Sequence, residues 1–355
     1  MSNEIRNFAP SWPAAVMGTA ILPIALNLSS SLLPWMHEAA IAFFFLSLAL
    51  LVVITLVMAI RLVLNPKGYL QDYLHPVAGA FLPTLPIAFI IVALDLLVLG
   101  PGLLGEAAST TAAFWLFGLG AAGIWLLGLA LGIRFFENEE IKLGMATFGW
   151  FIPPVSQLII TVGGLELVKH LERGAVADLV VLLALAGLGI GTLLFLFMGA
   201  AIFHRYVFAG LPPPRMSPTI AIGMAPTAVL VVALAKLAAA QSFTGLPIGF
   251  PGLGALAAFL GIALWGYSAF WFLLALLMLI RGWKAMKPHF GLPWWAMTFP
   301  LGALAVATGS LGQLLGTALL EPVLAGLTVL LLLVWTAVAF GTIRGAGNLS
   351  IFVRE

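Results

Sequence analysis

Ten long apolar segments make up most of the chain, separated by short breaks that are charged or rich in proline and glycine. Each has roughly 20 or more residues, enough to cross the ~30 Å hydrocarbon core of a bilayer. Charged residues are only 8% of the chain, against about 25% in a soluble domain, so the chain cannot cover a water-facing surface. We therefore expect one all-α integral membrane domain over residues 1–355. Its predicted spans are 8–26, 38–61, 76–99, 107–134, 145–163, 175–203, 217–236, 252–280, 290–312 and 319–343.

Basic residues fall almost entirely on one side of this ten-span topology. Twelve lie on that side: Arg6, Arg61, Lys67, Arg134, Lys142, Arg205, Arg215, Arg281, Lys284, Lys287, Arg344 and Arg354. Only Lys169, Arg173 and Lys236 lie on the other. Cytoplasmic loops of membrane proteins carry an excess of lysine and arginine. We therefore predict a multi-pass protein of the cell membrane (inner or plasma membrane) with both termini in the cytoplasm.

Prolines recur at near-constant spacing on alternate spans. One proline from each odd-numbered span forms a series with intervals of 70, 70, 73 and 74 residues: Pro13, Pro83, Pro153, Pro226 and Pro300. The even-numbered spans are rich in leucine and alanine and almost free of proline. Proline is common in membrane helices, which accounts for any single one of these but not for the spacing. Five tandem helical hairpins would produce this period.

Each recurring proline is expected to disturb the backbone of its helix. A proline removes the hydrogen bond to the carbonyl four residues earlier and bends the helix. The carbonyls left unpaired would be those of Gly79, Gly149, Ile222 and Ala296. Irregular backbone at membrane depth survives only where it is buried in protein or lines a wet cavity. We therefore expect kinked odd helices around a central pore, with the even helices outside them.

Five stretches of sequence carry a resemblance to a known family. They are FAPSWPAAVMGTAIL at 8–22, HPVAGAFLPTLPIAF at 75–89, WFIPPVSQLI at 150–159, GLPPPRMSPTIAIGMAPTA at 210–228 and WWAMTFPLGALA at 294–305. In this order they resemble the tellurite-resistance/dicarboxylate transporter family, which includes plant slow anion channels, bacterial tellurite-resistance proteins, fungal malate permeases and sulfite efflux pumps. The resemblance implies a homotrimer in which each subunit has its own pore of five inner helices. One departure is Pro13, where the family usually has an aromatic residue after the tryptophan.

The resemblance also implies a gate, formed by the phenylalanine before the proline of the ninth span, here Phe299. The residues at the equivalent positions of the other four repeats are Trp12, Leu82, Ile152 and Ala225, and we predict that they line the pore. A narrow apolar ring excludes water and so blocks ions. The alternative is that Phe299, one of 25 phenylalanines, simply packs against neighbouring helices.

Charged residues within the spans bear on the substrate. Those identified are Glu38, Asp95, Asp178, Lys236 and Glu321, all near the outer end. Each could be an interfacial residue, and Lys236 is the candidate for attracting anions to the outer mouth. A proton-coupled carrier usually places an ionisable residue at depth, and a malate site would favour arginine or lysine there. A neutral pore binds weakly, which suits rapid passage of ions.

The function predicted from these features is a passive anion channel for small anions such as chloride and nitrate. Neutral hydrogen-bond donors for the pore could be Thr84, Ser156, Gln157, Thr227, Thr298 and Thr308. The alternative within transport is a carrier for C4-dicarboxylates such as malate, or for sulfite or tellurite, as elsewhere in the family. Flux that is indifferent to a proton gradient would distinguish the channel from a coupled carrier.

Other classes of function find little support in the sequence. An integral membrane enzyme is disfavoured because no paired carboxylates, histidine cluster or nucleophile–base set lies at one depth. With no cysteine in the chain, thiolate catalysis and iron–sulfur clusters are excluded. The five histidines lack ligand spacing, so we predict no metal, no cofactor and no nucleic-acid partner. ENEEIK at 137–142 is interpreted as a solvated inner loop that could contact a cytoplasmic regulator.

Overall fold

The computed structural model describes residues 3–138, 141–211, 214–240, 243–286 and 290–352, and these form helices with no strand among them. Nine spans within these ranges are long and apolar enough to cross a membrane. They are Trp35–Leu64, Gly79–Val98, Glu106–Glu137, Phe148–His170, Ala175–Phe208, Met216–Ala240, Leu253–Gly282, Leu292–Leu315 and Ala318–Gly347. The first predicted span corresponds to a shorter apolar helix, Pro13–Ser29. The all-α membrane class is therefore confirmed, while the count of ten crossings stays a prediction.

Five helices form a closed inner ring. They are α2 (Pro13–Ser29), α5 (Thr84–Val98), α8 (Ile152–Leu167), α10 (Ala225–Ala240) and α12 (Thr298–Leu315). Each packs against two others of the set, in the order α2, α5, α8, α10, α12 and back to α2. The ring is what five repeated units arranged around an axis would build.

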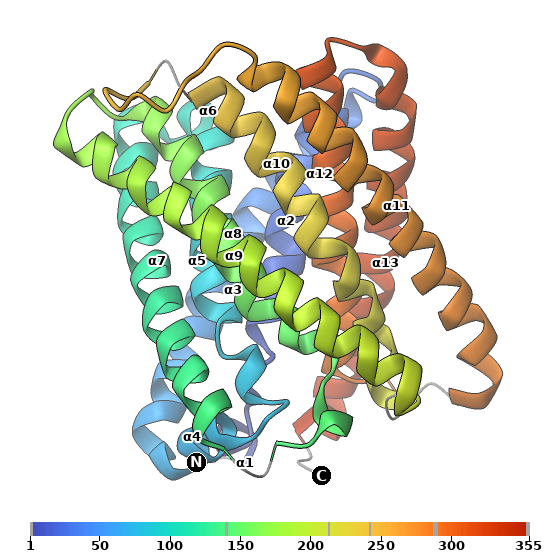
Figure 1. The fold of residues 1–355 in the computed structure, drawn as a ribbon. Coiled ribbons are helices and arrows are strands. Elements are labelled where there is room, and N and C mark those ends of the chain that lie inside the picture. Colours follow the sequence, from blue (N-terminus) through green and yellow to red (C-terminus); the bar gives the residue numbers. More distant parts are fainter. Residues whose placement is uncertain (1–2, 139–140, 212–213, 241–242, 287–289, 353–355) are drawn as a thin grey trace.

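Five longer helices surround this ring. They are α3 (Trp35–Leu64), α7 (Glu106–Glu137), α9 (Ala175–Phe208), α11 (Leu253–Met286) and α13 (Glu321–Gly347). Each packs extensively against the inner helix that precedes it in the chain, and the long diagonal of α9 in front of α8 is visible in Figure 1. The described chain is thus a series of five hairpins, each with one inner and one outer helix.

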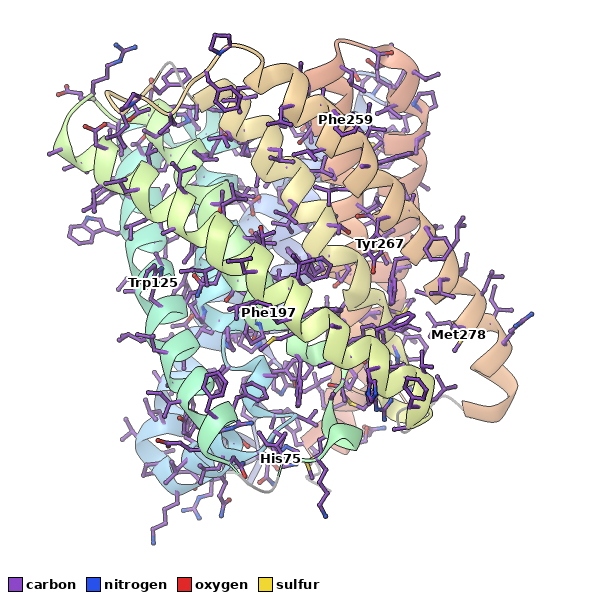
Figure 2. The ribbon with its side chains drawn as sticks, in the orientation of Figure 1. His75, Trp125, Phe197, Phe259, Tyr267 and Met278 are labelled. Carbon is purple, nitrogen blue, oxygen red and sulfur yellow. The ribbon has the colours of Figure 1, made fainter. Side chains whose placement is uncertain are left out.

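Burial separates the two rings. In the four inner spans that begin with Gly79–Val98, 78% to 100% of the residues in the most apolar stretch are buried. In the five outer spans the corresponding share is 11% to 28%. Large apolar side chains cover the outer helices, and Figure 2 shows Phe197 on α9 and Phe259 on α11 among them, each 70% exposed. Such a surface suits contact with lipid, because a soluble protein rarely exposes contiguous apolar patches of this extent.

The recurring prolines lie at the beginnings of the inner α-helices. Pro13 and Pro153 occupy the first helical turn of α2 and α8, Pro83 is the N-cap residue of α5, and Pro226 and Pro300 are the second and third residues of α10 and α12. The first N–H groups of a helix have no partner within it, so proline there costs little. This corrects the prediction of prolines that kink continuous helices.

Short 3-10 helices precede four of these α-helices. They are η1 (Gly79–Phe81), η3 (Phe148–Phe151), η5 (Pro214–Met224) and η6 (Leu292–Met297). Two carbonyls that were predicted to be unpaired are satisfied there, because the N–H of Leu82 donates to Gly79 and the N–H of Ile152 donates to Gly149. The irregular backbone of these four inner spans is therefore a change from 3-10 to α geometry near the proline.

The first and last described elements, α1 (Asn3–Arg6) and η8 (Ser350–Phe352), lie at the same end of the bundle, where Figure 1 marks both termini. The outer helices end there with arginines, three of which are buried. Arg61 pairs with Asp72 of α4 (Pro66–Leu74), Arg134 donates to the carbonyls of Tyr73 and His75, and Arg205 donates to the carbonyl of Gly210 at 2.7 Å. These arginines hold the loops at that end.

Some predicted features cannot be compared with the structure. Lys287 and Arg354, which contribute to the predicted charge asymmetry, lie outside the described residues, as do residues 139–140 of the predicted inner loop.

Asp178, predicted near the outer end, lies in the first turn of α9 and accepts hydrogen bonds from Thr244 and the backbone N–H of Gly245. It therefore tethers a loop at the end opposite the termini.

Candidate functional site

Each inner helix presents one stripe of residues to the space enclosed by the ring, with spacings of three and four residues. On α12 the stripe is Phe299, Ala303, Val306, Ser310 and Gln313. On α10 it is Ala225, Val229, Val232 and Lys236, and on α8 it is Ile152, Val155, Ile159 and Val162. On α5 it is Thr84, Ile87, Ile91, Leu94 and Val98, and on α2 it is Ala14, Met17, Ile21, Ile24 and Asn27. All five stripes have the period of one helical face.

A first cavity, here called the inner cavity, lies between the beginnings of the five inner helices. Its volume is about 40 Å³. Besides the stripes, its wall includes residues of the 3-10 segments, namely Phe81, Ile222, Leu292, Trp295 and Ala296. Thr84 supplies one of its few polar groups, and the Thr84 hydroxyl is already engaged with the carbonyl of Phe81 at 2.6 Å. A cavity with so few polar partners holds water poorly.

A second cavity, here called the outer cavity, lies further along the same five helices. Its volume is about 120 Å³. Most of its wall is apolar, but its far end carries Asn27, Ser310, Gln313 and Lys236. The outer cavity is thus the larger of the two and the more polar.

Phe299 belongs to the wall of both cavities. It is the second residue of α12, it is 5% exposed, and Pro300 beside it lines the inner cavity. The ring of Phe299 therefore lies where the two cavities approach each other.

Ile152 and Ala225 lie with Phe299 in the wall of the inner cavity. Trp12 and Leu82 line neither cavity, which corrects the predicted five-residue ring. Trp12 instead stacks on Phe8 and Phe352, with ring centroids 4.8 and 5.7 Å away, and so joins the two end segments of the described chain. Near these two positions, Met17 of α2 and Thr84 of α5 line the inner cavity instead of Trp12 and Leu82.

Most of the predicted neutral donors also face away from the two cavities. Among them Thr84 alone lines either cavity. The hydroxyl of Thr227 shares a hydrogen bond of 2.6 Å with that of Ser268 on α11, and Thr308 accepts from the indole of Trp265 at 2.9 Å. These groups connect inner helices to outer ones. The hydroxyls of Thr227 and Thr308 therefore serve packing between the two rings.

Lys236 lines the outer cavity and forms an ion pair. Its ammonium donates to Glu166 Oε2, and the same oxygen accepts from Lys169 Nζ at 2.8 Å. Glu166 follows Val162 by four residues on α8 and is 9% exposed. Glu166 was not among the charged residues predicted within the spans. Continuing the α8 stripe by one helical turn would have found it.

A wider depression opens beside the outer cavity, with a volume of about 690 Å³. We call it the vestibule. It shares Asn27, Leu28 and Gln313 with the outer cavity and also carries Glu321 from the first turn of α13. The shared residues lie between the two spaces, so the vestibule borders the outer cavity at the bundle end opposite the termini.

Asp95 lies on α5 but outside the cavities. It is fully buried, and Ser47 of α3 donates to its Oδ2 at 3.2 Å. Among the described residues, no group of three or more histidine, aspartate or glutamate side chains could hold a metal ion. The polar groups that could meet a solute are therefore those at the far end of the outer cavity and in the vestibule.

Comparisons with known proteins agree with this architecture. A family model described as SLAC1, voltage-dependent anion channel, matches residues 7–343. An uncharacterized transporter of Methanocaldococcus jannaschii is 30% identical over 345 residues, covering 97% of this chain and 96% of its own length. The sulfite efflux pump SSU1 of Trichophyton rubrum is 25% identical over 323 residues, covering 87% of this chain and 83% of its own length.

The ring of five apolar helices, the outer ring around it and the two cavities within the inner ring are typical of a multi-pass membrane protein of the transporter and channel class. The extent of the family match makes the assignment more specific. The chain belongs to the SLAC1 family of anion channels and transporters, and the family predicted from the sequence is confirmed.

Proposed function

We propose that the protein is a passive channel for small anions, closed by the side chain of Phe299. The observation that carries this proposal is that Phe299 belongs to the walls of two cavities that lie in line within the ring of inner helices. Around Phe299 both walls are apolar, and a narrow apolar constriction blocks ions because water leaves it. Moving or removing the ring would join the cavities.

A passive mechanism is favoured by the charges of the two cavities. Lys236 is the one charged residue in their described walls, and it lies at the far end of the outer cavity, paired with Glu166. Proton-coupled transporters commonly carry ionisable residues along the substrate path at membrane depth. The stretch from Val232 down to the 3-10 segments offers none among its lining residues.

Sulfite is the second candidate substrate, because relatives at 25% and 24% identity are sulfite efflux pumps. For malate or tellurite we have only the broader family resemblance. We further propose a homotrimer, with one pore in each subunit, in the cell membrane and with the arginine-rich end of the bundle in the cytoplasm. The arginines at the inner ends of the outer helices support that orientation.

The test is anion flux through the purified protein in sealed liposomes. Flux would be measured for both the wild type and Phe299→Ala, because the proposal expects the wild-type pore to be closed. Chloride, nitrate, sulfite and malate would each be supplied with and without an imposed proton gradient. We expect flux of the small anions down their own gradients, unchanged by the proton gradient. Flux that requires the proton gradient would establish a coupled carrier, and absence of flux for every anion would refute the proposal.

A further inference from the structure

We infer that the far end of the outer cavity is a binding site for one small monovalent anion, formed by Lys236, Asn27, Ser310 and Gln313, with Glu166 as a competing internal anion. This inference rests on the proposed anion transport and adds to it the site and charge class of the ligand. It begins from the four polar side chains that three different inner helices bring to one cavity.

Lys236 supplies the charge of the site. It is the one cation among the described residues that line the inner cavity, the outer cavity and the vestibule. The side chain is 21% exposed and lines the outer cavity. An ammonium has three N–H donors. Within the described chain, Lys236 donates to Glu166 Oε2.

The neutral donors come from two other inner helices, α2 and α12. Asn27 lies near the end of α2, and Ser310 and Gln313 are three residues apart on α12. Amide N–H₂ and hydroxyl groups can each donate to an anion. A cavity of about 120 Å³ is several times the ~10–15 Å³ that one water needs, so a small anion fits there with part of its hydration.

Glu166 determines the net charge. One carboxylate oxygen is shared by two lysines, Lys236 and Lys169, so the cluster carries one negative and two positive charges. The single excess positive charge matches a monovalent anion. A dianion would bring a second charge that no described cation of the cavity could meet.

The same geometry explains how the site can release its ligand. When an anion binds Lys236, Glu166 can remain paired with Lys169 at 2.8 Å instead of being left alone in an apolar region. When the anion leaves, Glu166 is available to the Lys236 ammonium again. This exchange keeps anion binding weak, as conduction requires.

The vestibule provides access to the site but no attraction. Its lining includes Glu321 and no described lysine or arginine, so an anion entering it meets its first favourable charge at Lys236. Asn27 and Gln313 belong to both spaces. They therefore form the boundary that an anion crosses to reach the site.

The experiment measures binding separately from flux. Purified protein would be titrated with chloride, nitrate or malate at constant ionic strength, with gluconate as the replacing anion, and thermal stabilisation would report binding. Lys236→Gln, Glu166→Gln and the double variant would be compared with Arg173→Gln. This control removes an exposed positive charge near the same end of the bundle that lines none of the three cavities.

We expect saturable binding of chloride and nitrate by the wild type and weaker binding of malate. Lys236→Gln should weaken chloride binding at least about tenfold, as expected for the loss of a charged hydrogen-bond donor, and Glu166→Gln should strengthen it. Arg173→Gln should leave it unchanged. The double variant removes both partners of the ion pair, so it should fold even if Lys236→Gln does not, and it should bind as weakly as Lys236→Gln.

Unchanged chloride affinity in both Lys236→Gln and the double variant would overturn the site, as would an equal loss in Arg173→Gln. Flux of the Phe299→Ala protein in liposomes distinguishes the two proposals. If chloride binding depends on Lys236 but no anion flux is measured, the proposed site stands and the proposed channel is refuted. If anion flux is measured but chloride binding does not depend on Lys236, the proposed channel stands and the proposed site is refuted.

Discussion

Replacing Phe299 with alanine should raise anion flux strongly while costing little stability. Truncating a tightly packed phenylalanine to alanine typically costs about 3–5 kcal/mol, because the ring loses contacts on all sides. Phe299 borders a cavity on each side, so part of its ring surface has no packing contacts to lose. We therefore expect a loss in the free energy of unfolding below about 3 kcal/mol.

The same substitution should join the two cavities and let water into the constriction. Lowering the barrier to permeation by only ~1.4 kcal/mol raises flux about tenfold, so a rise of at least that size is expected for Phe299→Ala. Phe299→Leu keeps apolar bulk and should raise flux less. The assay is anion current in planar bilayers, or flux in liposomes, paired with thermal unfolding of each purified variant.

Phe44→Ala is the matched control. Phe44 of α3 is fully buried and lines neither cavity, so its truncation should cost the full ~3–5 kcal/mol and leave flux at the wild-type level. A Phe299→Ala protein that is destabilised as much as Phe44→Ala and conducts no better than the wild type would refute the gate. Phe299 would then be a packing residue.

Two further predictions concern assembly and packing. Native mass spectrometry of the detergent-solubilised protein should show mainly trimers, and a spectrum dominated by monomer or dimer would argue against the proposed assembly. Gly302→Ala should destabilise the protein by ~1–3 kcal/mol in thermal unfolding, because the added methyl group would clash with Cγ2 of Ile21 where α12 meets α2. At Gly118 on α7 nothing lies within 4 Å of such a methyl group, so Gly118→Ala should be neutral or stabilising by up to ~1 kcal/mol. Equal effects at the two glycines would refute the packing argument.

The architecture was predictable because the repeat leaves a clear trace in the sequence. Proline spacing and the alternation of proline-containing and proline-free segments predicted five hairpins, with the proline-containing helices inside. The stripes that line the cavities could also have been predicted in part. Four of them continue from the repeated proline at intervals of three and four residues, whereas that of α8 continues from Ile152, the residue before its proline. On α8 and α10 the same continuation leads to Glu166 and Lys236, one turn beyond Val162 and Val232.

The local geometry of the prolines was less predictable. A proline within an apolar segment is compatible with a kinked helix and with the first turn of a new one. The choice depends on whether the preceding residues adopt 3-10 geometry, which tertiary contacts decide. The predicted unpaired carbonyls of Gly79 and Gly149 were wrong for this reason, since both accept 3-10 hydrogen bonds.

The same uncertainty explains the errors in the predicted ring. We chose the residue before each repeated proline, but these residues stand at different positions relative to their helices. Phe299 is the second residue of α12, and Ile152 and Ala225 are the first residues of α8 and α10. Trp12 and Leu82 precede α2 and α5. Each residue of offset rotates a helical side chain by about 100°, so equal sequence positions need not face the same cavity.

The central claim is that Phe299 separates the inner cavity from the outer one, and single cysteines test it most directly. The chain contains no cysteine, so Ser310→Cys would place one thiol in the outer cavity and Ala225→Cys one in the inner cavity. A small anionic thiosulfonate that cannot cross the bilayer would be added to either side of sealed vesicles. With Phe299 present, we predict that the Ser310→Cys thiol reacts from one side only and the Ala225→Cys thiol only from the opposite side. With Phe299→Ala, each thiol should react from both sides. Reaction from both sides with Phe299 present, or sidedness unchanged by Phe299→Ala, would contradict the account.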